Sequence, residues 1–248
     1  MTPSAWPPPA VPPAQPASRG FSVPLIIGTW VAAWLAGNIV GAVVVLASGH
    51  EDTDPSRMPT WVVSASAASL WIPALVALLL VSRSRGTGSW SRDFGLRARW
   101  VDLVGLPIGL ASQLILVPLV TLPFTRFFPD SFSAERVEER AKGLADMASG
   151  PWIVLLALVV VVGAPLVEEL VYRGFIQLGL AKRIGAAVSL LITAVVFTLV
   201  HLSPPEFPGL FAFSLVLGFC TARTGRLGMA IAAHVAFNAT GLLLVVLL

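Results

Sequence analysis

The feature that most constrains this chain is a series of long apolar runs that contain no charged side chain. Val23–Ala47, Trp61–Val81 and Leu103–Thr125 each exceed the roughly 20 residues that a helix needs to cross a bilayer. Only 12% of all residues are charged, about half the share of a soluble domain. The runs do not alternate apolar with polar residues, as the strands of a membrane barrel do. We therefore expect an all-α fold, a polytopic transmembrane helical bundle.

The apolar pattern divides the chain into a tail and two membrane regions. Residues 1–22 begin with a proline-rich stretch, which favours a disordered cytoplasmic tail. A three-span region is expected over residues 23–150 and a second membrane region over residues 151–248. The expected spanning helices, about seven in number, cover approximately residues 23–47, 60–82, 101–125, 151–172, 186–202, 208–222 and 228–247.

Basic residues concentrate in alternate connecting segments. Residues 83–100 hold five arginines against one aspartate, and the short turns 182–185 and 223–226 are also basic. The positive-inside rule places these three segments and the N-terminus in the cytoplasm. The net charge of +3 is therefore an orientation signal, and we expect no nucleic-acid partner. Arginine far outnumbers lysine, which favours a bacterial source and hence a multi-pass protein of the inner cell membrane.

Residues 133–149 have the pattern of a short amphipathic helix. Val137, Ala141 and Leu144 fall on one face, and Glu138 and Lys142 are spaced to form a pair. One interpretation is a helix that lies on the outer membrane surface. The other is a lid or a partner-binding element.

Polar and ionisable residues occur inside the expected spans of the C-terminal half. A charged side chain at the bilayer centre costs roughly 2.5–3.5 kcal/mol on insertion scales, and the first three spans contain none. Such groups should face one another rather than lipid. The candidate site residues are Glu168, Glu169, Arg173, His201, His234 and Asn238.

The spacing of these residues indicates how they face. Glu169 and Arg173 are four residues apart, so they share a helix face and can pair. Glu168 lies about 100° round the helix from Glu169 and should point elsewhere. His234 and Asn238 are also four residues apart and should converge on one spot.

Together these groups form a set that can activate water. A carboxylate can act as a general base, and imidazoles can bind a metal or stabilise an oxyanion. Glu168, His201 and His234 could supply a His₂Glu zinc set with an open water position. The residues alone leave other interpretations open: a structural ion network, packed histidines, and an asparagine that bonds between helices.

The depths of the motifs agree only in part. If the fourth helix continues to Lys182, Glu168 lies about 20 Å along it from the cytoplasmic turn, and His201 lies about 22–24 Å from that turn. His234 lies only about 12 Å from Arg226 by the same measure. Tilt, a kink at Pro165, or a fourth helix that protrudes into the cytoplasm could account for the difference.

Three motifs in this order resemble the CAAX protease and bacteriocin-processing family. The motifs are Glu-Glu-x-x-x-Arg at 168–173, Phe-x-x-x-His at 197–201 and His-x-x-x-Asn at 234–238. The stretch Arg223-Thr-Gly225 also looks like the family. The family consists of intramembrane endopeptidases and includes the type 2 CAAX prenyl endopeptidases. The resemblance covers about residues 150–240, and the N-terminal 150 residues match only as variable spanning helices.

The resemblance implies hydrolysis of a peptide bond in a membrane-associated peptide or protein. Glu168 would activate the attacking water, with His201 assisting it or binding a metal. Glu169 and Arg173 would support the site. The chain lacks the His-Glu-x-x-His motif and any mid-span aspartate, which disfavours two other classes of intramembrane protease.

The same resemblance leaves the cofactor open between a zinc ion and a metal-free glutamate mechanism. His234 and Asn238 would hold a metal or the oxyanion, and asparagine suits the oxyanion better because it is a poor zinc ligand. Two alternatives to an enzyme remain open at this point. One is a non-catalytic membrane scaffold or bacteriocin-immunity protein, and the other is a proton-coupled transporter.

Overall fold

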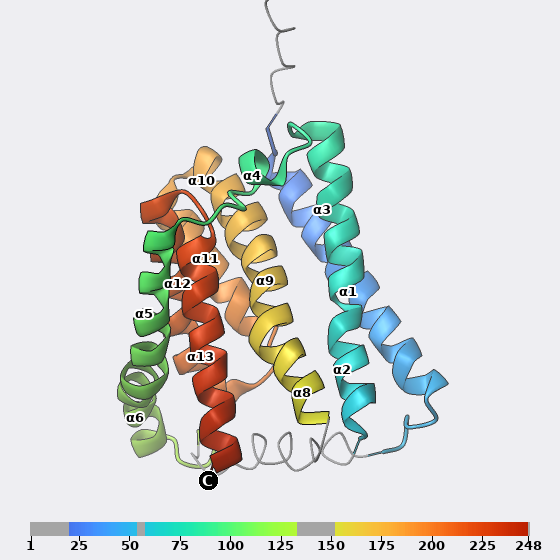
Figure 1. Cartoon of the computed structure of the whole chain (residues 1–248), viewed down its shortest axis with the longest axis vertical. Coiled ribbons are helices and arrows are strands. Elements are labelled where there is room, and N and C mark those ends of the chain that lie inside the picture. The colour runs from blue at the N-terminus through green and yellow to red at the C-terminus, as the bar shows by residue number, and fades with distance from the viewer. Residues whose placement is uncertain (1–19, 54–57, 133–151, 248) are drawn as a thin grey trace, which may run out of the picture.

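The computed structural model describes residues 20–53, 58–132 and 152–247, and every regular element in these ranges is a helix. The expected all-α membrane bundle is therefore confirmed. The amphipathic helix predicted over residues 133–149 lies outside the described residues. Residues 1–19 of the predicted tail also lie outside them. The helices run side by side along the long axis of the molecule (Figure 1).

The N-terminal region forms three long helical segments. The first is α1 (Val23–Ala47), which Ser22 caps by accepting a hydrogen bond from the Leu25 amide at 3.4 Å. The second joins two helices at Leu70, and the third contains a 3₁₀ turn and a π-helical turn. After α1, the elements are α2 (Thr60–Ser69), α3 (Trp71–Arg85), α4 (Trp90–Asp93), η2 (Trp100–Val104), α5 (Gly105–Ala111), η3 (Ser112–Leu116) and α6 (Val117–Phe127).

The C-terminal region begins with a long helical segment that ends at Gly185, where a left-handed φ of 86° lets the chain turn back. Gly225 (φ 63°) ends α12 (Phe207–Thr224) in the same way. The elements are α8 (Trp152–Ala157), η4 (Leu158–Gly163), α9 (Ala164–Glu168), η5 (Glu169–Gln177), α10 (Leu178–Ile184), α11 (Ala186–Leu199), η6 (Pro204–Glu206), α12 (Phe207–Thr224) and α13 (Gly228–Leu247).

The seven expected spans all coincide with apolar helices. In the described residues, five helical segments are long and apolar enough to cross a membrane, and the shorter apolar helices 186–199 and 228–244 match the other two expected ranges. The fourth segment is longer than expected, because it runs without a break from Trp152 to Ile184.

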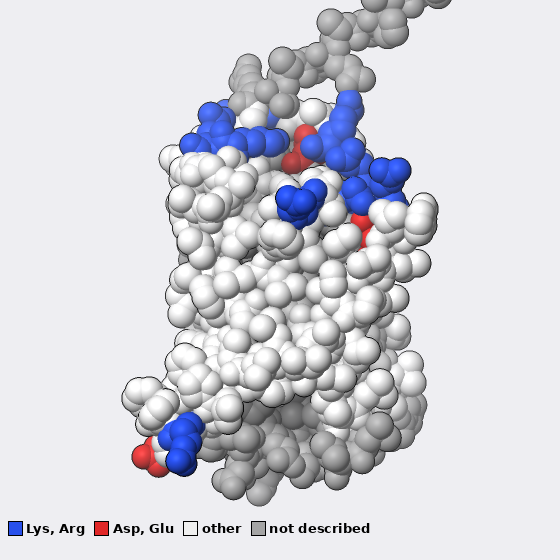
Figure 2. Space-filling view, turned by 90° about the vertical axis from the view of Figure 1, so that its left-hand side faces the viewer, with Lys and Arg blue, Asp and Glu red and all other residues white. Residues whose placement is uncertain are grey.

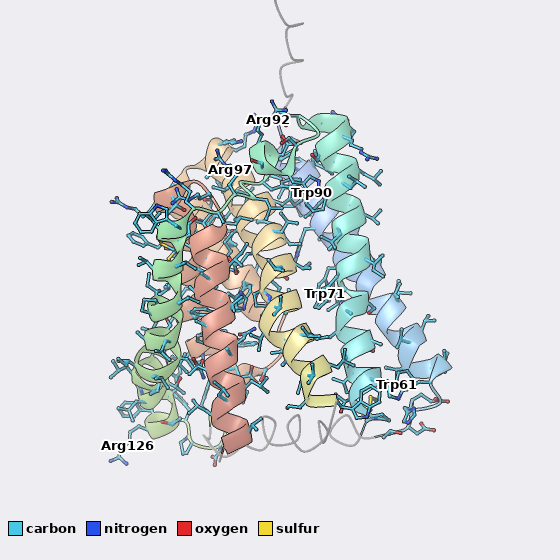
Figure 3. The ribbon with its side chains drawn as sticks, in the orientation of Figure 1. Trp61, Trp71, Trp90, Arg92, Arg97 and Arg126 are labelled. Carbon is cyan, nitrogen blue, oxygen red and sulfur yellow. The ribbon has the colours of Figure 1, made fainter. Side chains whose placement is uncertain are left out.

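The three basic segments meet at one end of the bundle. Arg97 Nη2 donates to the Gly225 carbonyl at 3.5 Å, and Arg183 Nε donates to the Phe21 carbonyl at 3.1 Å. Figure 2 shows arginine and lysine gathered at this end, above a band of the visible face that carries no charge. In Figure 3, Arg97 marks this end and Arg126 the opposite one. This arrangement agrees with the shared side that the charge pattern predicts.

Helix α13 packs closely against α5 through two glycines. A Cβ at Gly105 would collide with the Met229 carbonyl, and one at Gly109 would collide with the backbone of Ala233. Only glycine lets the two helix backbones approach so closely. This contact matters for the site because α13 carries His234.

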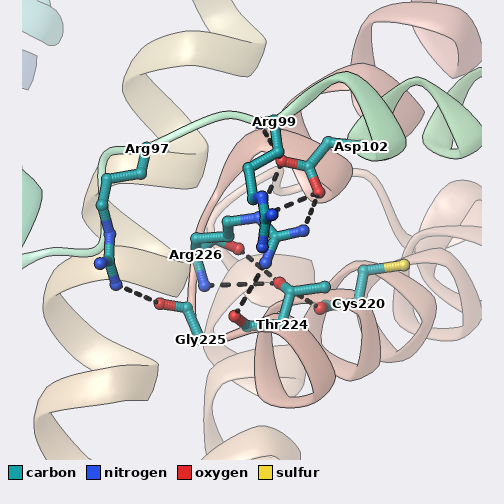
Figure 4. Close-up of polar contacts among 7 residues, drawn as sticks. All are labelled: Arg97, Arg99, Asp102, Cys220, Thr224, Gly225 and Arg226. Atoms are coloured by element: carbon teal, nitrogen blue, oxygen red, sulfur yellow. Dashed lines mark hydrogen bonds and ion pairs between the residues drawn. The ribbon is translucent and has the colours of Figure 1, made fainter.

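An ion pair fixes the start of the third segment to the turn before α13 (Figure 4). Arg226 donates from Nε to Asp102 Oδ2 at 2.9 Å and from Nη2 to Oδ1 at 2.7 Å. Asp102 also accepts from the Arg99 backbone amide at 2.7 Å. The bidentate geometry holds α5 and α13 in register at the basic end.

Candidate active site

The two adjacent glutamates face in different directions, as their spacing predicts. Glu169 is fully buried, and its Oε1 lies 3.1 Å from Nη1 of Arg173, which is also fully buried. Glu168 is 27% exposed and lines a cavity of about 200 Å³. One carboxylate is therefore held in an ion pair while the other remains open to a ligand.

His234 joins the buried pair from α13. Its Nδ1 lies 2.8 Å from Glu169 Oε1, and its Nε2 lies 3.9 Å from Glu168 Oε2. Because a carboxylate paired with arginine can only accept, Nδ1 carries a hydrogen. In the neutral form of the ring, His234 then presents the Nε2 lone pair toward Glu168.

His201 is oriented by Phe197, one helical turn before it. Its Nδ1 lies 2.6 Å from the Phe197 carbonyl oxygen, and the two ring centroids are 4.8 Å apart. A carbonyl only accepts, so the neutral imidazole leaves an Nε2 lone pair for other partners. The centroid of the Phe197 ring also lies 4.3 Å from Arg173 Cζ and 6.0 Å from the centroid of the His234 ring.

The cavity lies between the N-terminal and C-terminal regions. Glu168 and His201 line it together, so these two predicted residues face one space. Most of the remaining lining is apolar or aromatic and includes Trp30, Trp34 and Trp71, which come from α1 and α3. Trp71 lies between α3 and α9 in Figure 3. The site therefore combines a polar edge with an aromatic wall.

Asn238 is placed differently from the prediction. Its Nδ2 donates to the Val160 carbonyl at 2.8 Å, in the π-helical turn η4, while His234 bonds to Glu169. The two side chains share a face of α13, but they meet different levels of the long helix. Neither is among the residues that line the cavity.

The candidate zinc ligands are of suitable types but are not gathered into a metal site. Within residues 20–53, 58–132 and 152–247, no group of three or more His, Cys, Asp and Glu side chains is placed to hold a metal ion. Glu168, His201 and His234 as placed here therefore do not fit the His₂Glu set.

The contacts of the turn before α13 explain why His234 can lie beside the two glutamates although it is fewer residues from its own basic turn. A Cβ at Gly174 would lie 3.3 Å from Leu227 Cδ1, and a Cβ at Gly95 would lie 3.1 Å from both the Gly225 carbonyl oxygen and Leu178 Cδ1. The turn thus lies beside residues 174–178 of the fourth segment, and α10 extends beyond it to Ile184. A protruding fourth helix lets His234 reach Glu169.

Several groups at the site were not predicted from the sequence. Ser214 on α12 accepts a hydrogen bond from Arg173 Nη2 at 2.8 Å, and Gln177 donates to the Gly218 carbonyl at 2.8 Å. Trp30 and Tyr172 both line the cavity. A serine or tryptophan inside an apolar span carries no spacing signal, so only the fold identifies these partners.

The comparisons with known proteins bear on the same part of the chain. Residues 150–240 match the family model described as type II CAAX prenyl endopeptidase, Rce1-like. Over these residues the chain is similar to that family. The resemblance inferred from the three motifs is confirmed, and the match supports a CAAX-type intramembrane endopeptidase in general. No curated protein and no solved structure matches the chain.

The Rce1-like region and the cavity do not coincide. All six candidate residues lie within residues 150–240, on η5, α9, α13 and the turn just after α11. The aromatic wall from α1 and α3 lies outside the matched region. The matched region therefore supplies the polar residues and part of the apolar lining, and α1 and α3 add the tryptophans.

Proposed function

We propose that this protein is an intramembrane endopeptidase that hydrolyses a peptide bond in a membrane-associated peptide or protein. The observation that carries the proposal is the shared cavity of Glu168 and His201, with His234 directed toward Glu168 and held by Glu169. The Rce1-like match supports this class of activity. The basic end of the bundle would face the cytoplasm, in line with the positive-inside rule.

The nucleophile would be a water held between Glu168 and His234. Glu168 Oε2 and His234 Nε2 are 3.9 Å apart, too far for a direct hydrogen bond and close enough for one water to donate to both. Both atoms are acceptors, so the water would present an oxygen lone pair to the substrate. The buried Arg173–Glu169 pair would keep His234 in this tautomer.

The reaction would proceed through a tetrahedral intermediate. The water oxygen bonds to the carbonyl carbon while its proton passes to Glu168. When the C–N bond breaks, Glu168 returns this proton to the leaving amine. His201 Nε2, on the same cavity, would accept a hydrogen bond from a peptide N–H and orient the substrate. Asn238 Nδ2 carries a second hydrogen, and the oxyanion role stays a prediction for it.

The aromatic wall supports an apolar substrate. Trp30, Trp34 and Trp71 give the cavity an apolar side on which an acyl, prenyl or apolar peptide segment can pack. The family description names a prenylated CAAX substrate, and a farnesylated CAAX peptide is therefore the first probe.

The test measures cleavage of a fluorogenic farnesylated CAAX peptide in proteoliposomes, with products identified by mass spectrometry. Glu168→Gln keeps the shape of the side chain and removes the base, so turnover should fall by about 10²–10⁴-fold. Glu51→Gln, in an exposed loop, is the matched control and should leave turnover unchanged. Full activity in Glu168→Gln would remove Glu168 as the base. Proton flux without cleavage would favour a transporter.

A further inference from the structure

A second cavity, of about 180 Å³, lies at the basic end of the bundle. It is lined by Gly20, Ser22, Leu25, Arg85 and Arg183, which come from the start of α1 and the ends of α3 and α10. None of these residues lines the cavity of the candidate active site. The second cavity is therefore a separate feature that the proposed function does not use.

The charge that lines this cavity is entirely positive. Arg183 donates from Nε to the Phe21 carbonyl at 3.1 Å, which holds its guanidinium in place and leaves its two terminal nitrogens for a ligand. Among the described residues, Arg85 makes no hydrogen bond or ion pair, and the lining contains no acid. Two guanidinium groups without a counter-ion favour an anion, and arginine matches phosphate oxygens in a bidentate way.

The start of α1 adds to this preference. The first turn of this 25-residue helix contains no acidic residue, so the partial positive charge of its N-terminus is not neutralised locally. A Cβ at Gly20 would lie 3.3 Å from Arg183 Nη2, which shows how closely the chain passes the guanidinium. The helix end and both arginines therefore surround one small volume.

An apolar path continues from this cavity along α1. Gly28, Ala32 and Leu35 follow Leu25 at intervals of one helical turn, and all three are exposed. A Cβ at Gly28 would have nothing within 4 Å, so this face of the helix is open. On a helix that crosses the membrane, an exposed apolar stripe faces the acyl chains.

We propose that the cavity binds the phosphate group of an anionic phospholipid, with an acyl chain along Leu25, Gly28, Ala32 and Leu35. The apolar path favours a lipid over a free phosphate ion, because an ion would use only the arginines. Basic pockets between spanning helices at the cytoplasmic side are suited to such headgroups. Bound lipid would hold α1 against α10, and α1 also supplies Trp30 and Trp34 to the first cavity.

Native mass spectrometry of the whole protein with phosphatidylglycerol tests the proposal. The double variant Arg85→Gln/Arg183→Gln should retain this lipid about tenfold less than the wild type. Arg83→Gln/Lys182→Gln is the matched control, because it removes the same charge from the same two helix ends outside the cavity. Its retention should stay within about twofold of the wild type. An equal loss of phosphatidylglycerol retention in both double variants would overturn the proposed site, because it would mean that any positive charge at this end of the bundle attracts the lipid.

A second variant tests the acyl path without changing charge. Gly28→Leu adds a side chain to the open face of α1, where a Cβ would have nothing within 4 Å, and should lower phosphatidylglycerol retention. Unchanged retention would overturn the lipid path. Phosphatidylcholine should compete poorly, and equal retention of it would overturn the preference for an anionic lipid. Displacement of phosphatidylglycerol by millimolar inorganic phosphate would identify a free anion site instead. None of these readouts depends on peptidase activity.

Discussion

The N-terminal and C-terminal regions differ in the position of their buried charged groups. In the N-terminal region Asp93 and Asp102 are buried at the basic end, and the spans themselves are mostly exposed, with 11–22% of each window buried. In the C-terminal region Glu169 and Arg173 are buried within a span, and the two long spans have 28% and 39% of their windows buried. The C-terminal region thus carries the buried polar groups of the candidate site. The N-terminal region supplies the tryptophans that line the cavity, and its own buried charges lie at the basic end.

The largest effect that this comparison predicts is on the buried ion pair. Arg173→Met leaves Glu169 buried beside His234 without its cation, and should lower the free energy of unfolding by about 3–5 kcal/mol. Arg126→Met, at an exposed position of α6, should change it by less than about 0.5 kcal/mol. Denaturant unfolding in detergent micelles measures both. Similar values for the two variants would contradict the proposed division between the regions.

The sequence predicted the parts of the site that depend on one helix. The separation of Glu168 from Glu169 and the pairing of Glu169 with Arg173 follow from helix geometry, and the structure shows both. The structure also shows the rings of Phe197 and His201, four residues apart, in contact.

Contacts between helices were predicted less well. Helix periodicity predicts on which face of a helix a side chain lies, but not how far one helix is shifted along its neighbour. His234 and Asn238 share a face, yet the level of α13 against the fourth segment places Asn238 beside Val160 rather than beside Glu169. The Ser214 contact to Arg173 depends in the same way on how α12 lies. Apolar spans without spacing signals also gave no indication that α1 and α3 form the cavity wall.

The next effect in size concerns the glycines by which α5 meets α13. Gly109→Leu introduces a side chain against the Ala233 backbone, and should cost about 1–3 kcal/mol of stability and shift His234. Turnover should therefore fall more than unfolding alone explains, at temperatures where the variant stays folded. Gly28→Ala, on the open face of α1, is the control and should be neutral or slightly stabilising. Equal destabilisation of both variants would argue against the close α5–α13 contact.

A smaller, pH-dependent effect is expected at Asp93, the last residue of α4, whose carboxylate contacts Ser82 on α3. Burial acts to raise the pKa of Asp93, but hydrogen bonds from Ser82 Oγ, at 2.6 Å, and from Thr87 hold that pKa below its ordinary value. A depressed folded pKa means that this stability is present above about pH 4 and is lost as the pH falls through the folded pKa.

Asp93→Asn tests this dependence. It should lower stability at neutral pH by about 1–2 kcal/mol, and the difference from the wild type should shrink near about pH 3. Asp130→Asn, exposed at the opposite end, should show neither effect. A difference for Asp93→Asn that stays constant from neutral to acidic pH would assign the loss to altered packing rather than to charge.

The smallest expected effect is that of metal removal, and it bears on how the C-terminal region uses its histidines. His234 has Nδ1 on Glu169 and His201 has Nδ1 on the Phe197 carbonyl, and the described residues do not gather these rings with Glu168 into a metal site. With the proposed water between Glu168 and His234 as the nucleophile, dialysis against a strong chelator should change the rate of peptide cleavage by less than about twofold. A large loss that zinc restores would mean that α11 and α13 close around an ion, and metal analysis of the same samples would then give its stoichiometry. In that case His234 would have to turn Nε2 from the water to the metal, and replacement of Glu169, which fixes its tautomer, would weaken zinc binding by about 10–100-fold.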